Sequence, residues 1–333
     1  MSTVAAETNN VLFSALAEVV GSENVLLDIE QRNLYSCDVY SEGNLCAAVV
    51  RPASAEALSK AARLITEHGY SLAPRGGGMS YTGGYIPIND TTVMVDTGAM
   101  NQILELNEAD MYVTVQAGVT WAQLYEALKP TGLRLPFFGT FSGVRATVGG
   151  GMSNGALFFG TARYGTAVDN LRGLEVVLAD GTRIRTGQTS VNNGKPFYRT
   201  YGPDLTGLFT HDAGTLGIKT EATLRLIQAP AESAYLSFVF KGAQEVARGL
   251  SAVARSGAAE EAYVFDPGST AKNLSTSDIA SDVKTLAKVI KGQSSLGKGL
   301  KEGAKLVAAG RSFVDEDLFS LHIVCAGRGE ASV

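Results

Sequence analysis

Three clusters of glycine occur where loops of the chain would suit a phosphate-bearing ligand. They are Gly76-Gly77-Gly78 followed by Gly83-Gly84, Gly149-Gly150-Gly151 followed by Gly155, and Gly214-x-x-Gly217. Glycine allows a positive φ and a close approach of the backbone to a ligand, and successive N–H groups of such a turn form a nest for phosphate oxygens. Ser80 and Thr147 add hydroxyl donors. Each cluster alone also fits an ordinary tight turn, but three together favour a large ligand that carries phosphate.

The spacing does not fit the commoner nucleotide-binding motifs. Tyr81 stands where a G-x-G-x-x-G sequence needs its third glycine. Segment 292–299 (GQSSLGKG) resembles a Walker A loop, but it ends in glycine where Ser or Thr would hold Mg²⁺. Ser80, His211 and Asp212 supply the residue types of a hydrolase triad, yet no G-x-S-x-G elbow surrounds a serine.

Composition excludes several classes of protein. The 333 residues carry a net charge of −5, which argues against a nucleic-acid binder. The three cysteines form no C-x-x-C pair and the histidines no H-E-x-x-H motif, so we expect reduced thiols and no metal site. The N-terminus does not resemble a signal peptide, and no apolar run approaches the ~18 residues of a membrane span. These features predict a cytoplasmic protein without an integral membrane segment and without a nucleic-acid partner.

The elements around the first cluster follow a β-α-β order. An amphipathic pattern predicts a helix over residues 9–20, and a short apolar strand over 47–50 precedes a helix that Ser54 caps and Gly69 ends. A strand over 70–73 runs into the first glycine cluster, and a third strand covers 92–96. This order implies a right-handed crossover connection.

The pattern then changes to paired strands. Strands are predicted over 103–106 and 112–116, and Thr120-x-x-Gln123 forms a capping box at the start of a short helix. Residues 175–185 predict a hairpin whose Asp-Gly pair suits a type I′ turn. A long strand is predicted over 218–227.

Ala229-Pro230 marks a plausible domain boundary. Beyond it, strands are predicted over 235–240, 263–266 and 319–326, with helices over 243–255 and 279–290. Residues 291–310 are rich in Gly and Lys and predict a loop.

Further residue blocks accompany the glycine clusters in a fixed order. They are Arg51-Pro52, Pro74 to Ser80, Met100-Asn101-Gln102-Ile103, Val115 to Val119, Ala146 to Gly150 with Asn154, Arg163-Tyr164-Gly165, Asp169-Asn170, Glu175 to Gly181, and Ala213 to Ile218. In this order they resemble the flavoprotein oxidoreductases of the vanillyl-alcohol oxidase and p-cresol methylhydroxylase (PCMH) type. Within that family the chain is most similar to the glycolate oxidase, D-lactate dehydrogenase and D-2-hydroxyglutarate dehydrogenase group, densely over residues 45–228.

The resemblance implies an α+β fold: a PCMH-type, two-subdomain FAD-binding domain over residues 1–228, followed by a cap domain over 229–333. The subdomains would cover about 1–106 and 107–228. In the family the chain returns from the cap to the FAD-binding domain, so residues 229–333 are expected to form an incomplete, truncated cap. Most groups that bind substrate or act as the base lie in that later part, so the catalytic residues remain unknown.

The resemblance also implies a nucleotide-binding site for FAD. Residues 75–80 would cradle the pyrophosphate, residues 146–154 would line the isoalloxazine and ribityl region, and residues 214–218 would meet the adenosine end. The residues expected to bind the cofactor are Pro74, Arg75, Gly76, Gly77, Gly78, Met79, Ser80, Gly83, Thr147, Gly149, Gly150, Asn154, Gly214, Gly217 and Ile218.

The chain departs from the family at two points. Some relatives attach FAD through a histidine of the first loop; here that loop contains Met79 and no histidine, so we expect non-covalent FAD. Many relatives carry Gly-Ser-Glu before the third cluster, where this chain has His211-Asp212-Ala213. Two side chains keep alternative interpretations: Arg75 either contacts phosphate or supports the fold, and His211 either supports the site or takes part in it.

The resemblance implies an FAD-dependent oxidoreductase that transfers a hydride from an alcohol, preferably a 2-hydroxy acid, to flavin N5. An aromatic alcohol is the alternative substrate class. The expected partners are this small molecule and an electron acceptor, which is a quinone, a carrier protein or oxygen. The second hypothesis is an FAD-binding fragment or accessory subunit that has no turnover without a partner subunit or a C-terminal segment. The third is a non-flavin α+β protein with glycine-rich turns.

Overall fold

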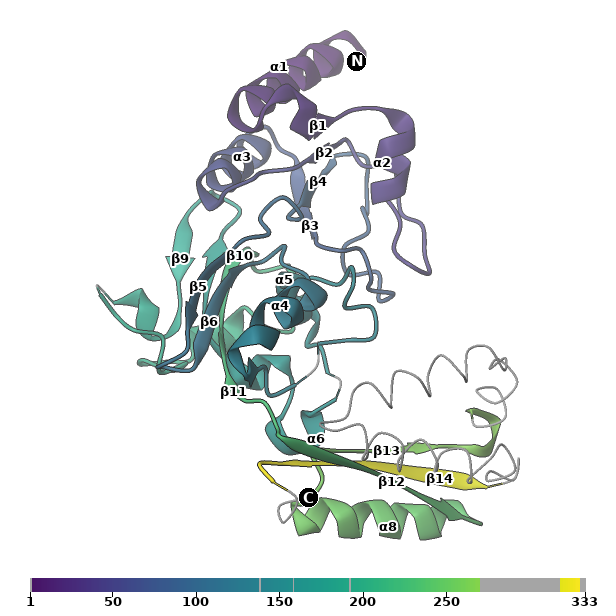
Figure 1. The fold of residues 1–333 in the computed structure, drawn as a ribbon. Helices are drawn as coiled ribbons and strands as arrows, with labels where there is room; N and C mark the ends of the chain where they lie inside the picture. Colours follow the sequence, from purple (N-terminus) through teal and green to yellow (C-terminus); the bar gives the residue numbers. More distant parts are fainter. Residues whose placement is uncertain (1, 138, 158, 192, 270–317, 330–333) are drawn as a thin grey trace. The chain divides into compact units, whose positions relative to one another are not determined.

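The computed structural model describes residues 2–137, 139–157, 159–191, 193–269 and 318–329. The chain folds into two compact units, residues 1–229 and 230–333. Figure 1 shows the path of the chain through the elements of each unit.

A four-stranded sheet opens the first unit. Its strands lie in the order β1 (Val25–Leu26), β2 (Ala48–Val50), β4 (Thr92–Asp96) and β3 (Ser71–Arg75). β2, β4 and β3 run parallel, and β1 is antiparallel to β2. The predicted β-α-β start is confirmed, but β4 lies between the two strands that the crossover connects.

Two helices pack against this sheet, α1 (Ser2–Val20) and α3 (Ala55–Glu67). The Ser54 hydroxyl caps α3 by accepting the N–H of Ala57 at 3.1 Å. The buried stripe of α3 is the predicted one: Leu58, Ala61, Ala62 and Ile65. Beside it, Leu12 and Leu16 of α1 are fully buried.

A further helix, α2 (Ile29–Tyr35), was not predicted. Asp28 begins it by accepting the N–H groups of Glu30 and Gln31. No residue of α2 is buried. Its sequence therefore lacks the apolar stripe from which helices are recognised.

A five-stranded antiparallel sheet forms the second half of this unit. Its order is β5 (Ile103–Asn107), β6 (Tyr112–Gln116), β10 (Ile218–Arg225), β8 (Leu171–Val177) and β9 (Arg183–Arg185). The chain thus passes from one sheet to the other between β4 and β5. β10 is the last of these five strands along the chain but lies at the centre of the sheet. The third glycine cluster comes directly before it in the sequence.

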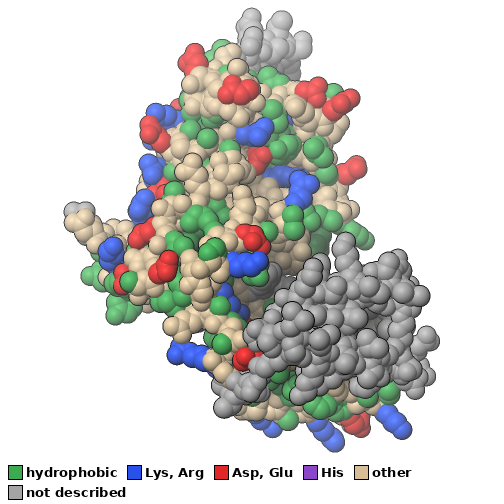
Figure 2. All heavy atoms as spheres, in the orientation of Figure 1, with side chains coloured by type: hydrophobic (Ala, Val, Ile, Leu, Met, Phe, Trp, Pro, Cys, Tyr) green, Lys and Arg blue, Asp and Glu red, His purple; other side chains and the backbone are tan. Residues whose placement is uncertain are grey.

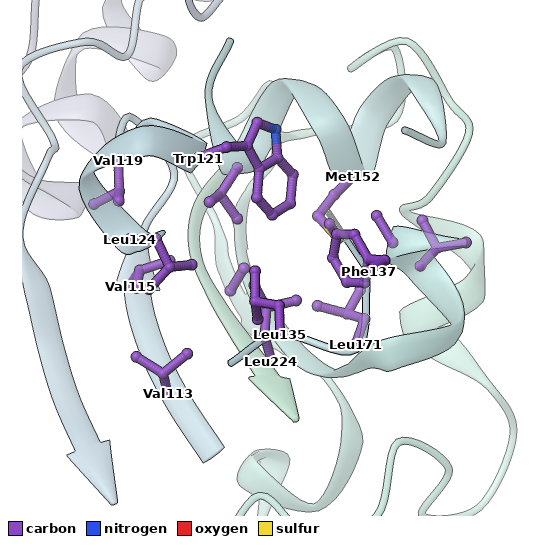
Figure 3. Packing of buried hydrophobic residues seen from close by; sticks show 14 of the residues in the cluster. Val113, Val115, Val119, Trp121, Leu124, Leu135, Phe137, Met152, Leu171 and Leu224 are labelled. Carbon is purple, nitrogen blue, oxygen red and sulfur yellow. The ribbon is translucent and has the colours of Figure 1, made fainter. Parts of the chain in front are cut away.

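The main hydrophobic core lies on one face of this sheet, under α4 (Trp121–Leu128) and α5 (Val148–Asn154). Figure 3 shows the side chains of Trp121, Leu124, Phe137 and Met152 converging on it. The predicted capping box of Thr120 and Gln123 begins α4. Helix α5 was not predicted, because three consecutive glycines are poor helix formers.

The remaining elements of the first unit are short. They are α6 (Thr161–Tyr164), α7 (Leu205–Leu208), β7 (Leu133–Arg134), β11 (Ile227–Gln228) and the 3₁₀ turns Ser22–Asn24, Lys129–Thr131, Ala167–Asn170 and Gly187–Ser190.

Two predictions for this unit need correction. The β8–β9 hairpin forms, but among its turn residues only Gly181 has a positive φ, whereas a type I′ turn needs two. Gly181 donates its N–H to Leu178 and the N–H of Leu178 bonds to Thr182, the pattern of a three-residue hairpin loop. The long strand predicted over 218–227 is divided, because β10 ends at Arg225 and the chain then pairs with β7 through β11.

The second unit contains a three-stranded antiparallel sheet in the order β12 (Glu232–Phe240), β14 (Phe319–Gly327) and β13 (Glu261–Phe265). Helix α8 (Ala243–Ser256) packs on one face, with Val246 against Leu321 and Ile323 in a small core. These elements confirm the predicted strands and the helix over 243–255. The predictions for 279–290 and 291–310 lie outside the described residues.

Figure 2 shows acidic and basic side chains interspersed over the visible face of the first unit. Within the described part of the chain, no helix has the length and apolar content that crossing a membrane requires.

Candidate functional site

A cavity of about 500 Å³ lies in the first unit where the three glycine clusters meet. Fourteen of the fifteen predicted cofactor-binding residues line it: Pro74, Arg75, Gly76, Gly77, Gly78, Met79, Ser80, Thr147, Gly149, Gly150, Asn154, Gly214, Gly217 and Ile218. The exception is Gly83, whose N–H donates to the Asp38 carboxylate at 2.8 Å, while its neighbour Gly84 reaches the cavity. Tertiary folding thus brings together residues that lie up to 144 positions apart in the chain (74 to 218).

The first two glycine loops touch each other directly. A Cβ atom on Gly76 would lie 2.3 Å from the Thr147 hydroxyl oxygen, and one on Gly77 would lie 1.8 Å from the Arg145 carbonyl oxygen. A carbon atom at either distance would overlap the oxygen. Glycine is therefore required at both positions by the neighbouring loop, before any ligand is considered.

The third loop contacts both of the others. A Cβ on Gly214, which has φ +82°, would lie 2.5 Å from the ring of Pro74. The N–H of Ala213 donates to Ser153 at 2.9 Å and that of His211 to Met152 at 3.2 Å. Each pair of loops is thus in contact, and the three form one continuous lining.

The second loop is the start of α5. The Thr147 hydroxyl accepts the N–H of Gly150 at 3.3 Å and caps this helix. The N–H of Gly149 donates to Ala117 at 2.8 Å, and a Cβ on Gly149 would lie 2.7 Å from the Ala117 methyl group. The glycines of this segment let α5 lie close to the end of β6.

The indole of Trp121 lines the cavity beside this helix. Trp121 is 3% exposed and meets Phe137 edge to face at a centroid distance of 5.4 Å. Gly139 and Gly151 leave the space for its indole, since a Cβ at either would lie within 2.5 Å of the ring. The indole Nε1 is buried and has no hydrogen-bond partner among the described residues.

Arg75 ends β3 at the mouth of the first loop. Its guanidinium donates to the carbonyls of Tyr35 at 3.2 Å and Cys37 at 2.5 Å. The guanidinium carbon lies 5.3 Å from the ring centre of Tyr35 and 5.0 Å from that of Tyr85. Arg75 therefore ties the α2 segment to the sheet, which favours the fold-supporting interpretation of this side chain, although it also lines the cavity.

Tyr35 is held from its other end by the carboxylate that closes β4. Its hydroxyl donates to Asp96 at 2.6 Å. Burial, the hydrogen bond to Asp96 and the charge of Asp96 together raise the pKa of Tyr35 to about 12. The phenol is therefore a stable donor across the physiological range.

The only charged residues in the described lining are Arg75 and Lys219. Lys219 pairs with Asp212, and both side chains are almost completely buried, at 2% and 3% exposed. Desolvation lowers the pKa of Lys219, while the hydrogen bond and charge of Asp212 oppose this effect. No carboxylate is part of the described lining, although Asp212 neutralises the charge of Lys219.

The other residues singled out in the sequence lie away from the cavity lining. His211 has a left-handed backbone at φ +56° and packs its ring against Gly155. Arg163 lies over the ring of Tyr164 at 5.6 Å, and neither belongs to the lining. Across the residues that the structure places, no group of three or more His, Cys, Asp or Glu side chains is arranged to hold a metal ion.

Sequence reasoning missed several side chains of the lining: Tyr81, Tyr85, Thr97, Trp121, Thr140, Ser142, Ser153, Leu157 and Lys219. Lys219 gave no signal, because its strand also contains Thr220, Glu221 and Arg225 and one more polar residue does not stand out there. Trp121 gave none either, since the glycines that accommodate it come from distant segments.

The residues present fit FAD as a ligand. Glycines of all three loops line the cavity, so that their backbone N–H groups can approach a phosphate closely, and the cavity has the size of cofactor sites. A lining largely of glycine, aromatic and small polar residues suits flat rings with a few polar edges.

Comparison with known proteins also identifies an FAD binding domain in this chain. The profile of the FAD binding domain matches residues 46–187. The glycolate oxidase subunit GlcD of Bacillus subtilis is 33% identical over 237 residues, which are 71% of this chain and 49% of that protein. The mitochondrial D-lactate dehydrogenase [cytochrome] 1 of Saccharomyces cerevisiae is 31% identical over 211 residues, which are 63% of this chain and 34% of that one.

The fold has a solved counterpart in p-cresol methylhydroxylase with substrate bound. The TM-score is 0.76 at 19% identity, with 98% of this chain and 62% of that chain covered. This chain spans about a third to a half of the length of the two curated relatives above. The α+β architecture, the FAD binding domain and the ordered sequence blocks agree. The chain therefore contains an FAD binding domain over residues 46–187 and has the fold of p-cresol methylhydroxylase.

Proposed function

We propose that the first unit binds FAD non-covalently in the cavity between the three glycine loops, and that the protein is an FAD-dependent oxidoreductase acting on the CH–OH group of a 2-hydroxy acid. The observation that carries this proposal is the mutual contact of the three glycine loops around one cavity whose described lining contains no carboxylate. Successive backbone N–H groups of such loops form nests for phosphate oxygens.

The substrate class rests on the relatives. Glycolate and D-lactate, named in the two curated relatives above, are both 2-hydroxy acids. Bound FAD would supply the hydride acceptor for oxidation of such an alcohol. The chain's own part is to hold the cofactor: the first loop through its backbone N–H groups, the second through α5 and Thr147, and the third through Gly214 to Ile218.

Non-covalent attachment rests on the composition of the lining. Met79 stands in the first loop, and the described lining contains no histidine. The lining also contains no Asp or Glu, so we assign the general base to none of its residues. We further propose that the second unit is part of a cap domain and that reduced flavin passes electrons to a quinone, a carrier protein or oxygen.

A second candidate is an FAD-binding module that turns over only with further polypeptide. The observation in its favour is that this chain matches 49% or less of the length of the two relatives above. It predicts stoichiometric FAD with no reduction of that FAD by any 2-hydroxy acid.

Binding is tested by titrating the purified chain with FAD. Trp121 is the single tryptophan and lines the cavity, so we expect saturable quenching of its fluorescence at one FAD per chain. FAD at 100 times its Kd should stabilise the fold by about 2.7 kcal/mol. Acid precipitation should release all flavin into the supernatant. A colourless protein that shows neither quenching nor stabilisation would refute the proposal.

Activity is tested by anaerobic mixing of the FAD-loaded chain with glycolate, D-lactate and an aromatic alcohol. Bleaching of the flavin absorbance by the hydroxy acids supports the proposed class, and bleaching by the aromatic alcohol alone contradicts it. Bound FAD that no substrate bleaches favours the binding module. Reoxidation by oxygen, a quinone or a cytochrome then identifies the acceptor.

A further inference from the structure

The third glycine loop is held by a buried ion pair between Asp212 and Lys219. The two side chains are 3% and 2% exposed, and the ammonium group of Lys219 bonds directly to the Asp212 carboxylate. The same carboxylate accepts the N–H of Gly214 at 3.0 Å and that of Leu216 at 3.3 Å. One side chain thus fixes two backbone amides of the loop and one strand residue.

The backbone around Asp212 is strained. His211 and Ala213, its two neighbours, have φ values of +56° and +51°. Non-glycine residues rarely adopt this left-handed region, because Cβ approaches the carbonyl oxygen. Such conformations persist where surrounding contacts determine them. Here they are the bonds of His211 and Ala213 to α5 and, on the other side, those of the Asp212 carboxylate.

The strained loop forms a wall of the cavity. Ala213, Gly214, Gly217 and Lys219 all line it. The N–H of Ala213 also donates to Ser153 of α5, so a shift of the loop would disturb the contact between the second and third loops. The ion pair is therefore placed where it controls the shape of the wall.

Stability alone does not explain this pair. The cost of removing two charges from water offsets their attraction, and well-packed apolar side chains of the same size are often as stable or more stable. A buried pair is useful where it selects one conformation, which is the situation of a loop with two left-handed residues.

We propose that Asp212 and Lys219 are positioning residues for the cofactor: their ion pair holds loop 211–217 in its left-handed conformation and so preforms one wall of the cavity for FAD. This proposal rests on the proposed FAD site of the first unit. It adds that the affinity for FAD depends on this ion pair, in which Lys219 lines the cavity and Asp212 does not.

The test compares Asp212→Asn, Lys219→Met and the double variant, each as the full chain and well below its melting temperature. Each single variant leaves one buried charge unpaired and should weaken FAD binding at least tenfold, which is about 1.4 kcal/mol, as measured by Trp121 quenching. The two effects should be strongly non-additive in the double variant, because both act on one contact. Lys60→Met is the matched control, since the Lys60–Glu56 pair on α3 is exposed, and it should bind FAD like the wild type.

Hydrogen exchange of the apo-protein supplies a readout that needs no cofactor. The amides of Gly214 and Leu216 should exchange faster in Asp212→Asn, while those of β6 stay protected. Variants that melt earlier but bind FAD as tightly as the wild type would show a purely structural pair and overturn the inference, with the proposed function intact. If the wild type itself fails to bind FAD, both proposals fail together; unchanged exchange at Gly214 and Leu216 overturns the bracing role separately.

Discussion

The position that a Cβ atom would take on Gly77 lies 1.8 Å from the carbonyl oxygen of Arg145. The two residues are 68 positions apart (77 to 145), and the contact joins the loop after β3 to the segment before α5. It means that the first glycine cluster is shaped by the second as well as by any ligand.

Gly77→Ala should therefore force the two loops apart. We expect a loss of about 1–3 kcal/mol in the free energy of unfolding, as overpacked sites show, together with a large loss of FAD affinity. Urea unfolding and Trp121 quenching measure the two effects. Gly268→Ala is the control, because its Cβ would lie 3.6 Å from the nearest side-chain oxygen, an ordinary contact. Equal values for Gly77→Ala and the wild type would contradict the interlocked arrangement.

Arg75→Lys should behave almost like Arg75→Met. A lysine keeps the positive charge but lacks the planar fork that reaches two carbonyls while lying between the rings of Tyr35 and Tyr85. Both variants should lose about 1–3 kcal/mol of stability and expose residues 36–44 to limited proteolysis. If Arg75→Lys instead keeps full stability and only FAD binding weakens, the side chain acts on phosphate and not on the fold.

Trp121→Phe should cost packing but no hydrogen bond. The indole Nε1 is buried without a described partner, so its removal leaves no donor or acceptor unsatisfied. The smaller ring leaves a gap beside Gly139 and Gly151, for which we expect a loss of about 1–3 kcal/mol in the free energy of unfolding. The fluorescence signal of FAD binding should disappear, while a titration by flavin absorbance still reports binding. Residual quenching in this variant would show that the signal does not come from Trp121.

Tyr35 should make the fold sensitive to alkaline pH. Its pKa is raised from 10.0 to about 12 by burial, the hydrogen bond to Asp96 and the charge of Asp96. A raised pKa means that the folded state holds the proton more tightly, so this stabilisation is complete below pH 10 and is lost as the pH rises towards 12. Melting temperatures between pH 9 and 12 should fall less steeply in Tyr35→Phe than in the wild type. Parallel curves for the two proteins would show that the Tyr35–Asp96 contact contributes nothing to the pH dependence of the melting temperature.

Much of the local structure follows from the sequence. The stripe of α3, the cap at Ser54, the capping box of α4 and the strand positions depend on periodicity and on residues within one turn of each other. Helix α5 escaped prediction because its stability comes from contacts with β6 and Trp121 rather than from the propensity of its glycines. Helix α2 was not predicted because it buries no residue and so has no apolar stripe in its sequence.

The sequence by itself determined that three glycine loops exist, that they stand next to strands or a helix start, and that their order resembles one flavoprotein family. Tertiary structure alone decided that β4 lies between β2 and β3, that Gly77 meets Arg145, and that Asp212 pairs with Lys219 behind the cavity wall. The reason is that backbone conformation is set by near neighbours in the chain. A close approach or a buried charge depends on which distant segment fills the adjacent space, and no local pattern records that.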